Sequence, residues 1–208
     1  MQYRQIIITT IILLLFAVAG TTLVAYTFEK TRDQIAANER ATLLRKLHRL
    51  IAADQHDNVL LEDTITARDE ALLGSEEPVM VYRARRNGEP VALVIAAIAP
   101  DGYSGSIKLL VGINVDGTLS GVRVIAHRET PGLGDAIDEN RSDWIYIFDG
   151  KSLQAPDVDR WAVKKDGGDF DQLTGATITP RAVVKAARNA LLYYRDHQEA
   201  LFAPATPE

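Results

Sequence analysis

The chain has 208 residues, a formal net charge of −5 and no cysteine. This length is sufficient for one globular domain with an appendage. The acidic balance leaves no basic stripe that could neutralise phosphates, so nucleic acid is not expected as a partner. The absence of cysteine excludes disulfides, thiolate catalysis and iron–sulfur ligation.

The N-terminal region contains a largely apolar run from Ile6 to Phe28, with no ionisable side chain apart from Tyr26. A helix of this length covers about 35 Å at about 1.5 Å per residue, which is enough to cross a hydrocarbon core. We expect a transmembrane helix over 6–28, preceded by a short segment over 1–5. A cleavable signal peptide, with the small residues Ala17–Gly20 near a cleavage site, is the alternative. Positive charges flank the run on both sides and do not settle its orientation.

A helical linker is expected over 29–74. Leucine and isoleucine recur there at spacings of three and four, which predicts that a helix with one apolar face continues from Glu29 to Ala53. The residues of this face are Leu43, Leu44, Leu47, Leu50 and Ile51. Residues 57–74 are acidic and mixed in character, and a short helix with loops is expected there.

The pattern changes to strands at Val79. Two runs rich in Val, Ile and Leu are each interrupted by a turn dipeptide, Asn87-Gly88 in the first and Asp116-Gly117 in the second. Such dipeptides between apolar runs are typical of β-hairpins. The segment from Val79 to His127 therefore predicts a largely antiparallel sheet of about four strands.

Three short elements are expected after the hairpins. Residues Asp135–Ser142 predict a helix that has Asp135 as its N-cap and Asp138 in the capping-box position. Residues Trp144–Phe148 and Trp161–Lys164 are expected to be short strands or extended segments.

The last predicted element is a helix that begins near Pro180 and ends near Ala200, with a tail over 201–208. Thr179 as N-cap and proline at the first helical position are favourable chemistry for a helix start. The fold class is therefore α+β: an N-terminal transmembrane helix, then a domain over 75–200 whose mainly antiparallel sheet is flanked by helices.

No self-contained catalytic site is recognisable in the sequence. Glycine-rich dinucleotide and P-loop signatures and the nucleophile elbow are absent. The histidines at positions 48, 56, 127 and 197 show no metal-ligand spacing. We therefore expect neither catalytic residues nor a metal site.

The stretch DQLTGAT, residues 171–177, lies just before the last predicted helix. One interpretation is structural: a tight Gly175-Ala176 turn followed by a helix start, with Thr177 as an ordinary polar residue. The other interpretation is functional, because the exposed N–H groups and the dipole at a helix N-terminus favour a phosphate. Thr177 could contact such a phosphate or carry it covalently.

This stretch resembles the D-x-x-[ST]-G-A-T flavinylation motif. The motif occurs in the G subunits of Rnf (Rsx) electron-transport complexes and in the related C subunits of sodium-pumping NADH:quinone reductases. The resemblance implies FMN joined by a phosphoester to Thr177. It also implies a separate flavin transferase that uses FAD and recognises the motif residues, which here are Asp171, Thr174, Gly175, Ala176 and Thr177.

Two further stretches support the resemblance. GYSGSIKLLVGIN, residues 102–114, resembles the family's G-Y-x-G segment before a strand, and HRETPGLGD, residues 127–135, resembles its E-T-P-G-L-G loop. The resemblance implies that this loop lies along the isoalloxazine ring. The implied flavin-binding residues are Glu129, Thr130, Leu133, Gly134, Thr174, Gly175 and Ala176.

Two pairs of residues near these motifs stay undecided. Tyr103 and Ser104 are as typical of a turn as of a flavin neighbour. Lys164 and Lys165 either neutralise the phosphate or are a solvated pair.

The resemblance implies a membrane-anchored flavoprotein that relays electrons within an ion-translocating oxidoreductase complex linked to ferredoxin and NAD. It would be an electron-carrying part of a translocase in the bacterial inner membrane, single-pass, with its domain in the periplasm. The implied partners are the other membrane and peripheral components of the complex, the flavin transferase and the lipid bilayer. The alternatives are a cofactor-free assembly protein, with Glu29–Ile51 as its partner surface, and a periplasmic flavin-dependent reductase.

Overall fold

The computed structural model describes residues 2–203, with Gln2 described by its backbone alone. The chain forms two compact units whose boundary lies between Leu43 and Leu44. Of the expected terminal segments, Met1 in 1–5 and residues 204–208 in 201–208 lie outside the described residues. The proposed domain limits 6–28, 29–74 and 75–200 stay predictions.

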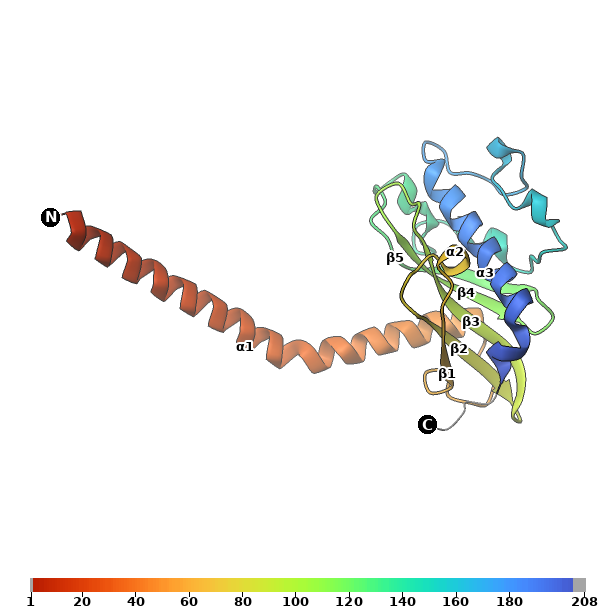
Figure 1. Ribbon diagram of the computed structural model, residues 1–208, viewed down its shortest axis with the longest axis horizontal. Coiled ribbons are helices and arrows are strands. Elements are labelled where there is room, and N and C mark those ends of the chain that lie inside the picture. Colours follow the sequence, from red (N-terminus) through yellow and green to blue (C-terminus); the bar gives the residue numbers. More distant parts are fainter. Residues whose placement is uncertain (1, 204–208) are drawn as a thin grey trace. The chain divides into compact units, whose positions relative to one another are not determined.

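Helix α1 runs without a break from Gln2 to Leu50 (Figure 1). The helix predicted for 29–53 is therefore present and ends at Leu50. Large apolar side chains between Ile6 and Phe28 are exposed, from 47% at Ile8 to 75% at Phe16. Among the described residues, α1 is the one helix that is long and apolar enough to cross a membrane.

The second unit is built on a five-stranded antiparallel sheet in the order β1-β2-β3-β4-β5, as Figure 1 shows. Its strands are β1 (Thr64–Ala67), β2 (Val79–Arg86), β3 (Glu89–Ala99), β4 (Ile107–Asn114) and β5 (Leu119–Ala126). Both predicted hairpins are confirmed. At the first, Asn87 and Gly88 have φ values of 52° and 83°, the positive values that a tight hairpin turn requires.

Strand β1 is a fifth strand within residues 57–74, where the sequence predicts only a short helix and loops. The expected helix is present as α2 (Glu70–Leu73). The four residues TITA of β1 pair with β2 in antiparallel register, from Thr64 opposite Tyr82 to Ala67 opposite Val79. Pairing with a distant strand stabilises this segment, and a four-residue run carries little local signal of its own.

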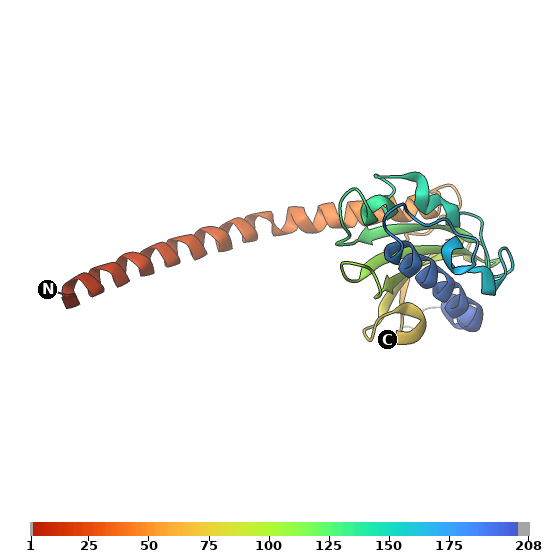
Figure 2. The same ribbon diagram turned by 90° about the horizontal axis from the view of Figure 1, so that it is seen from above.

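Both faces of the sheet are buried, which explains why its strands are continuous apolar runs. Helix α3 (Ile178–Phe202) lies across one face (Figure 2) and contacts β3 and β4. The core on that side includes Val111 and Val183, both 0% exposed. The last turn of α1 covers part of the opposite face, where Leu50 packs against the paired glycines Gly112 and Gly121.

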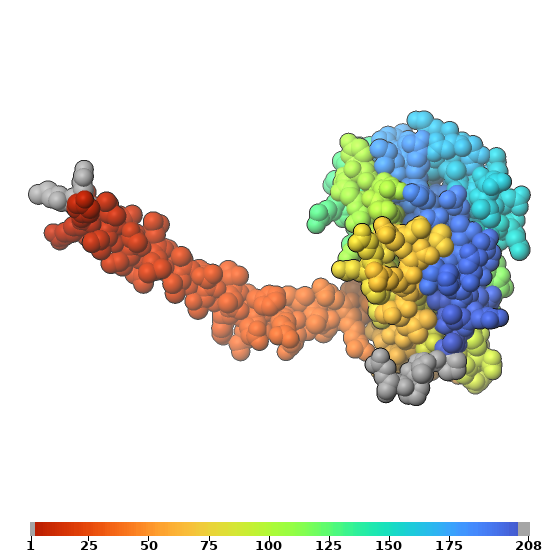
Figure 3. All heavy atoms as spheres, in the orientation of Figure 1, coloured from red at the N-terminus to blue at the C-terminus, as the bar shows by residue number. Residues whose placement is uncertain are grey.

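The C-terminal end of α3 is held by two arginines of β2. The guanidinium of Arg83 donates to the Ala203 carbonyl at 2.5 Å, and that of Arg85 donates to the Phe202 carbonyl at 2.9 Å. Both arginines also pair with the Asp63 carboxylate. Near its middle, α3 lies beside the short helix α2 (Figure 3), where the Asn189 amide donates to the Ala71 carbonyl at 3.3 Å. The helix is therefore fixed to the sheet at its C-terminal half.

The helix predicted for Asp135–Ser142 is wrong in extent and capping. The structure has a short 3-10 helix, η1 (Gly134–Ile137), with Leu133 before it and Asp138 at its C-terminal end. The Asp138 carboxylate accepts the Asn140 backbone N–H at 2.8 Å, and this local turn competes with continued helix.

Trp144–Phe148, predicted to be extended, is part of the 3-10 helix η2 (Asp143–Phe148), which is capped by Ser142. Tertiary packing overrides β-propensity here, because the Phe148 ring stacks on the rings of Trp161 and Phe170. Of Trp161–Lys164, also predicted to be extended, residues 161–163 are non-helical, and Val163 forms an isolated bridge with Phe170. The prediction is wrong at Lys164, which begins η4 (Lys164–Asp166) after η3 (Val158–Arg160).

Candidate functional site

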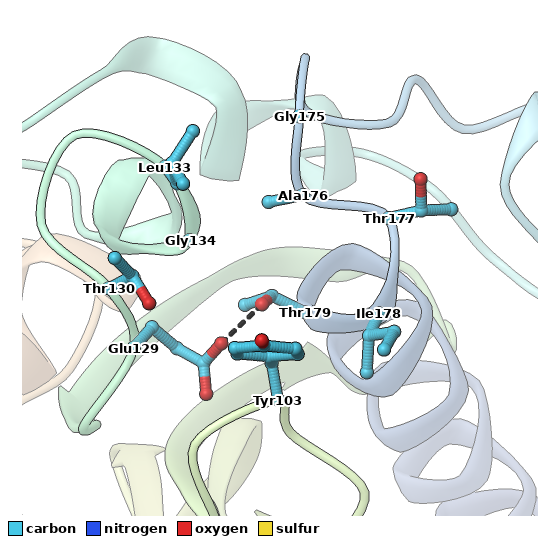
Figure 4. Close-up of a pocket in the computed structure, with 10 residues that line it drawn as sticks. All are labelled: Tyr103, Glu129, Thr130, Leu133, Gly134, Gly175, Ala176, Thr177, Ile178 and Thr179. Atoms are coloured by element: carbon cyan, nitrogen blue, oxygen red, sulfur yellow. Dashed lines mark hydrogen bonds between the residues drawn. The ribbon is translucent and has the colours of Figure 1, made fainter.

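A pocket of about 320 Å³ opens where three segments meet: the turn before β4, the loop between β5 and η1, and the start of α3 (Figure 4). These segments are distant in sequence, and the sheet with α3 brings them together. The residues that line the pocket are Tyr103, Glu129, Thr130, Leu133, Gly134, Gly175, Ala176, Thr177, Ile178 and Thr179.

Glu129 joins the three segments through hydrogen bonds. Its carboxylate accepts the Thr179 hydroxyl of α3 and, at 3.0 Å, the backbone N–H of Ser104. The Glu129 backbone N–H donates to Nδ1 of His127 at 3.2 Å. Glu129 and Thr179 are only 4% and 1% exposed. We call the Ser104–Glu129–Thr179 set the Glu129 latch.

Two glycines make room for the Glu129 latch. A Cβ on Gly134 would lie 2.9 Å from both the Glu129 Oε2 and the Thr179 Oγ1 atoms. A Cβ on Gly102 would lie 2.2 Å from the Gly105 carbonyl oxygen and 3.1 Å from Glu129 Oε1. Gly102 of the GYSG stretch and Gly134 of the ETPGLG stretch are thus required by close packing beside the Glu129 carboxylate.

Thr177 precedes the first residue of α3, and its carbonyl accepts the Arg181 N–H at 3.3 Å. Its backbone is helical, with φ −93° and ψ −30°, and its side chain makes no capping hydrogen bond. A capping threonine normally has an extended backbone and bonds the N–H of the second or third helical residue. Here the third helical residue is Pro180, which has no N–H. The Thr177 hydroxyl is therefore not used to start the helix.

The prediction that Thr179 is the N-cap is wrong, and so is the placement of Pro180 at the first helical position. The helix starts at Ile178, which places Thr179 and Pro180 second and third. The Thr179 hydroxyl is engaged by Glu129 inside the protein, so a buried tertiary hydrogen bond replaces the expected local cap.

The segment before Thr177 is anchored at its first residue and turns at Gly175. The Asp171 carbonyl accepts the indole N–H of Trp144 at 2.7 Å, and its carboxylate pairs with Lys164 at 2.6 Å. Gly175 has φ +79°, a left-handed conformation that favours glycine. An added Cβ there would lie 3.1 Å from Leu133. The turn thereby brings the motif against the ETPGLG loop.

Three large apolar side chains at the pocket are unusually exposed. Tyr103 is 67%, Leu133 44% and Ile178 45% exposed. An exposed apolar cluster around a concavity is typical of a ligand site.

The charge around the pocket is asymmetric. Glu129 is the one lining residue with a formal charge, and no Lys, Arg or His is among the residues that line the pocket. Near the first turn of α3, the hydrogen bond from the Arg181 guanidinium lowers the pKa of Asp166 below its ordinary value. That pair is exposed and does not line the pocket.

Most of the residues expected at a flavin site do line this pocket. They are Glu129, Thr130, Leu133, Gly134, Gly175, Ala176 and Thr177. Thr174 and Asp171 do not line it and are exposed on the approach to the turn. Whether any of these residues contacts flavin stays a prediction.

The undecided pairs occupy different positions. Tyr103 lines the pocket, whereas Ser104 contributes its backbone N–H to the Glu129 latch. Lys164 pairs with Asp171. Lys165 donates its backbone N–H to the Gln172 side chain at 3.3 Å. Ile178 and Thr179 also line the pocket. The sequence does not predict this, because its capping signals place the helix start two residues later.

Family models match two regions of the chain. One, described as the FMN-binding domain, covers residues 102–192, and the other, described as the RnfG N-terminal region, covers residues 1–50. Every residue that lines the pocket lies within 102–192.

Curated relatives match over nearly the whole chain. A protein of Pseudoalteromonas atlantica is 51% identical over 93% of this chain and 90% of its own length. One of Vibrio atlanticus is 52% identical over 93% and 92%, and one of Shewanella baltica is 50% identical over 92% and 91%. Each is named as the G subunit of an ion-translocating oxidoreductase complex.

The fold and the site thus define a protein with an FMN-binding domain that follows a long apolar helix. The sequence identity of about 50% to these relatives, over more than 90% of the chain, defines the family more narrowly. The chain belongs to the family of G subunits of ion-translocating oxidoreductase complexes. The resemblance inferred from its motifs is confirmed.

Proposed function

We propose that the protein carries FMN joined by a phosphoester to Thr177, and that the flavin occupies the pocket beside it. The observation that carries this proposal is the state of the Thr177 hydroxyl. Thr177 lines the pocket, and its hydroxyl points away from Glu129 (Figure 4) and makes no capping hydrogen bond. A modification there would leave the start of α3 intact.

The phosphate would lie at the N-terminus of α3. The backbone N–H groups of Ile178 and Thr179 have no partner within the helix, since the first N–H groups of any α-helix lack one. Such groups and the helix dipole favour an anion. No cationic side chain lines the pocket, so these N–H groups would supply the main favourable interaction with the phosphate.

The ring system would contact the apolar residues of the pocket. Leu133, Tyr103 and Ile178 offer exposed apolar surface, and burying it against a flat aromatic ring removes that surface from water. Thr130 also lines the pocket and carries a hydroxyl that can orient the ring edge. The residues present therefore fit a flavin nucleotide.

Attachment would require another protein, because no base lies beside Thr177 among the residues that line the pocket. A flavin transferase would catalyse it with FAD as donor. The Thr177 oxygen bonds to the phosphorus of the FMN half, the pyrophosphate bond of FAD breaks, and AMP leaves. The hydroxyl proton passes to the medium. The exposed Asp171, Thr174 and Gly175 would be accessible for recognition.

The electron-carrying role follows from the cofactor and the family. FMN exchanges one or two electrons, and the protein's part is to bind it and tune its electronics. We place the chain in a complex with other membrane and peripheral proteins, where it relays electrons coupled to ion translocation. α1 would span the bacterial inner membrane once, with the domain in the periplasm.

Intact mass spectrometry tests the attachment. Protein co-expressed with a flavin transferase should gain the mass of one FMN less water. Thr177→Ala should lose this gain, and Thr177→Ser, which keeps a hydroxyl, should retain it. Covalent flavin on the alanine variant would refute the site. A wild-type protein without flavin would instead favour a cofactor-free assembly role.

The orientation can be tested because the chain has no native cysteine. Glu76 is exposed on the second unit and Gln5 is exposed near the start of α1. A membrane-impermeant maleimide should label Glu76→Cys in spheroplasts and label Gln5→Cys only after lysis. The reverse pattern would place the domain in the cytoplasm.

A further inference from the structure

Within residues 2–203, Glu129 has no cationic partner. Its carboxylate is bonded by a threonine hydroxyl and a backbone N–H, both neutral donors. No ion pair involves it among the residues that the structure describes. Glu129 is nevertheless only 4% exposed, and a buried charge is normally paired.

Another buried acid of the domain shows the usual arrangement. The Glu139 side chain is 2% exposed and lies between two arginines, with Arg49 at 2.6 Å and Arg123 at 3.0 Å. Glu139 does not line the pocket, whereas Glu129 does. The unpaired carboxylate is therefore at the pocket, where a ligand would meet its charge.

We propose that Glu129 presents an uncompensated negative charge to the bound flavin and thereby lowers its midpoint potential. This inference rests on the proposed function. An electron added to a ring beside a fixed anion is opposed by Coulomb repulsion, which is stronger away from bulk water. Charge near the flavin ring is one of the means by which proteins tune this cofactor.

Glu129 has two separable roles, the hydrogen bonds of the Glu129 latch and its charge. Glu129→Gln removes the charge at nearly constant size and keeps one carbonyl acceptor. Thr179→Val removes the hydroxyl at similar size and keeps the charge. If the charge acts on the flavin, only the first variant raises the midpoint potential.

A third variant tests the charge without altering the latch. Thr130 lines the pocket and is exposed. Thr130→Lys places a cation beside the same site and should also raise the midpoint potential. Glu76→Gln removes an exposed carboxylate that does not line the pocket and is the control for a remote change of charge.

The experiment uses the full chain, co-expressed with flavin transferase and purified in detergent. Covalent flavin is quantified by intact mass, and the midpoint potential is measured by a spectroelectrochemical titration at fixed pH. We expect a positive shift for Glu129→Gln and for Thr130→Lys. We expect no positive shift for Thr179→Val and no shift for Glu76→Gln.

Three results would overturn the proposal: an unchanged potential in Glu129→Gln, an equal rise in Thr179→Val, or an unchanged potential in Thr130→Lys. If Glu129→Gln fails to fold or to take up flavin, an unchanged potential in Thr130→Lys still overturns the proposal, because it shows that charge at this site does not act on the flavin. Absence of covalent flavin from the wild type would refute the proposed function instead, so the two failures are distinguishable.

Discussion

The two ends of α3 differ in whether side chains bond the backbone groups there. At the C-terminal end, the guanidinium groups of Arg83 and Arg85 bond the Ala203 and Phe202 carbonyls. At the N-terminal end, the side chain of Thr177 makes no capping bond and the start of the helix lines a pocket. Side chains thus satisfy the final carbonyls but leave the first N–H groups available.

The difference indicates which end is built for stability and which for binding. Buried backbone groups are almost always hydrogen-bonded, and a helix end without partners calls for an explanation. A phosphate ester at Thr177 would provide those partners. Because Glu129 fixes Thr179 from inside, the N-terminal end can remain open without fraying.

Breaking the C-terminal end should have the largest effect on stability. Arg83 is 2% exposed and pairs with Asp63 as well as bonding Ala203. Arg83→Ala leaves buried groups unpaired and should lower the free energy of unfolding by about 3 kcal/mol. Denaturation in detergent, followed by the fluorescence of Trp144 and Trp161, measures it.

Arg86→Ala is the matched control for that variant. Arg86 is exposed and bonds only the Asp54 carbonyl, at 2.8 Å, among the described residues. Its loss should change the free energy of unfolding by about 0.5 kcal/mol or less. Equal effects of the two variants would show that Arg83 does not hold the end of α3.

A smaller loss of stability is expected from a substitution that crowds the N-terminal end of α3. Gly134→Ala places a Cβ 2.9 Å from Glu129 Oε2 and from Thr179 Oγ1. Both atoms belong to buried side chains, so relief requires a shift of the Glu129 latch. The cost should be about 1–3 kcal/mol, with reduced flavin incorporation. Unchanged incorporation in a destabilised variant would separate the latch from attachment.

The exposed ion pair of Arg181 with Asp166, near the N-terminal end of α3, should contribute still less to stability. The hydrogen bond from Arg181, and secondarily its charge, lower the pKa of Asp166 from 3.8. An acid with a lowered pKa in the folded state stabilises above its ordinary pKa and loses that contribution as pH falls. Asp166→Asn should therefore destabilise slightly at about pH 6, and the difference from the wild type should shrink as the pH falls below the ordinary carboxyl pKa. A difference that does not shrink with falling pH would contradict this assignment.

Thr177→Ala should have the smallest effect on the unloaded protein. The lost hydroxyl makes no capping bond, so the unfolding midpoint should stay within experimental error of the wild type. The same variant should lose all covalent flavin. A clear loss of stability without flavin would mean that Thr177 supports the helix after all.

The features of this structure that depend on neighbouring residues in the sequence, such as the hairpin turn, could be predicted. Asn87 and Gly88 adopt the positive φ values that their residue types favour. The motif 171–177 and the ETPGLG loop are contiguous stretches, and the structure brings residues 175–177 of the motif and the loop to one pocket. Such signals need only neighbouring residues.

What could not be predicted depends on distant partners. Thr179 is excellent N-cap chemistry, yet its hydroxyl is bonded by Glu129, 50 residues away in the sequence. The apolar run Trp144–Phe148 has the composition of a strand, but it packs its rings against a separate aromatic cluster and forms η2. Strand β1 is defined only by its pairing with β2.

The packing of Leu50 against Gly112 and Gly121 bears on any attempt to obtain the flavin domain as a soluble fragment. Leu47, Leu50 and Ile51 are at most 4% exposed, and the Lys46 ammonium donates to the Val124 carbonyl. A truncation placed after Ile51 would uncover one side of the sheet and invite aggregation. A fragment that starts at Glu29 removes the apolar run and still carries the leucines that complete the fold.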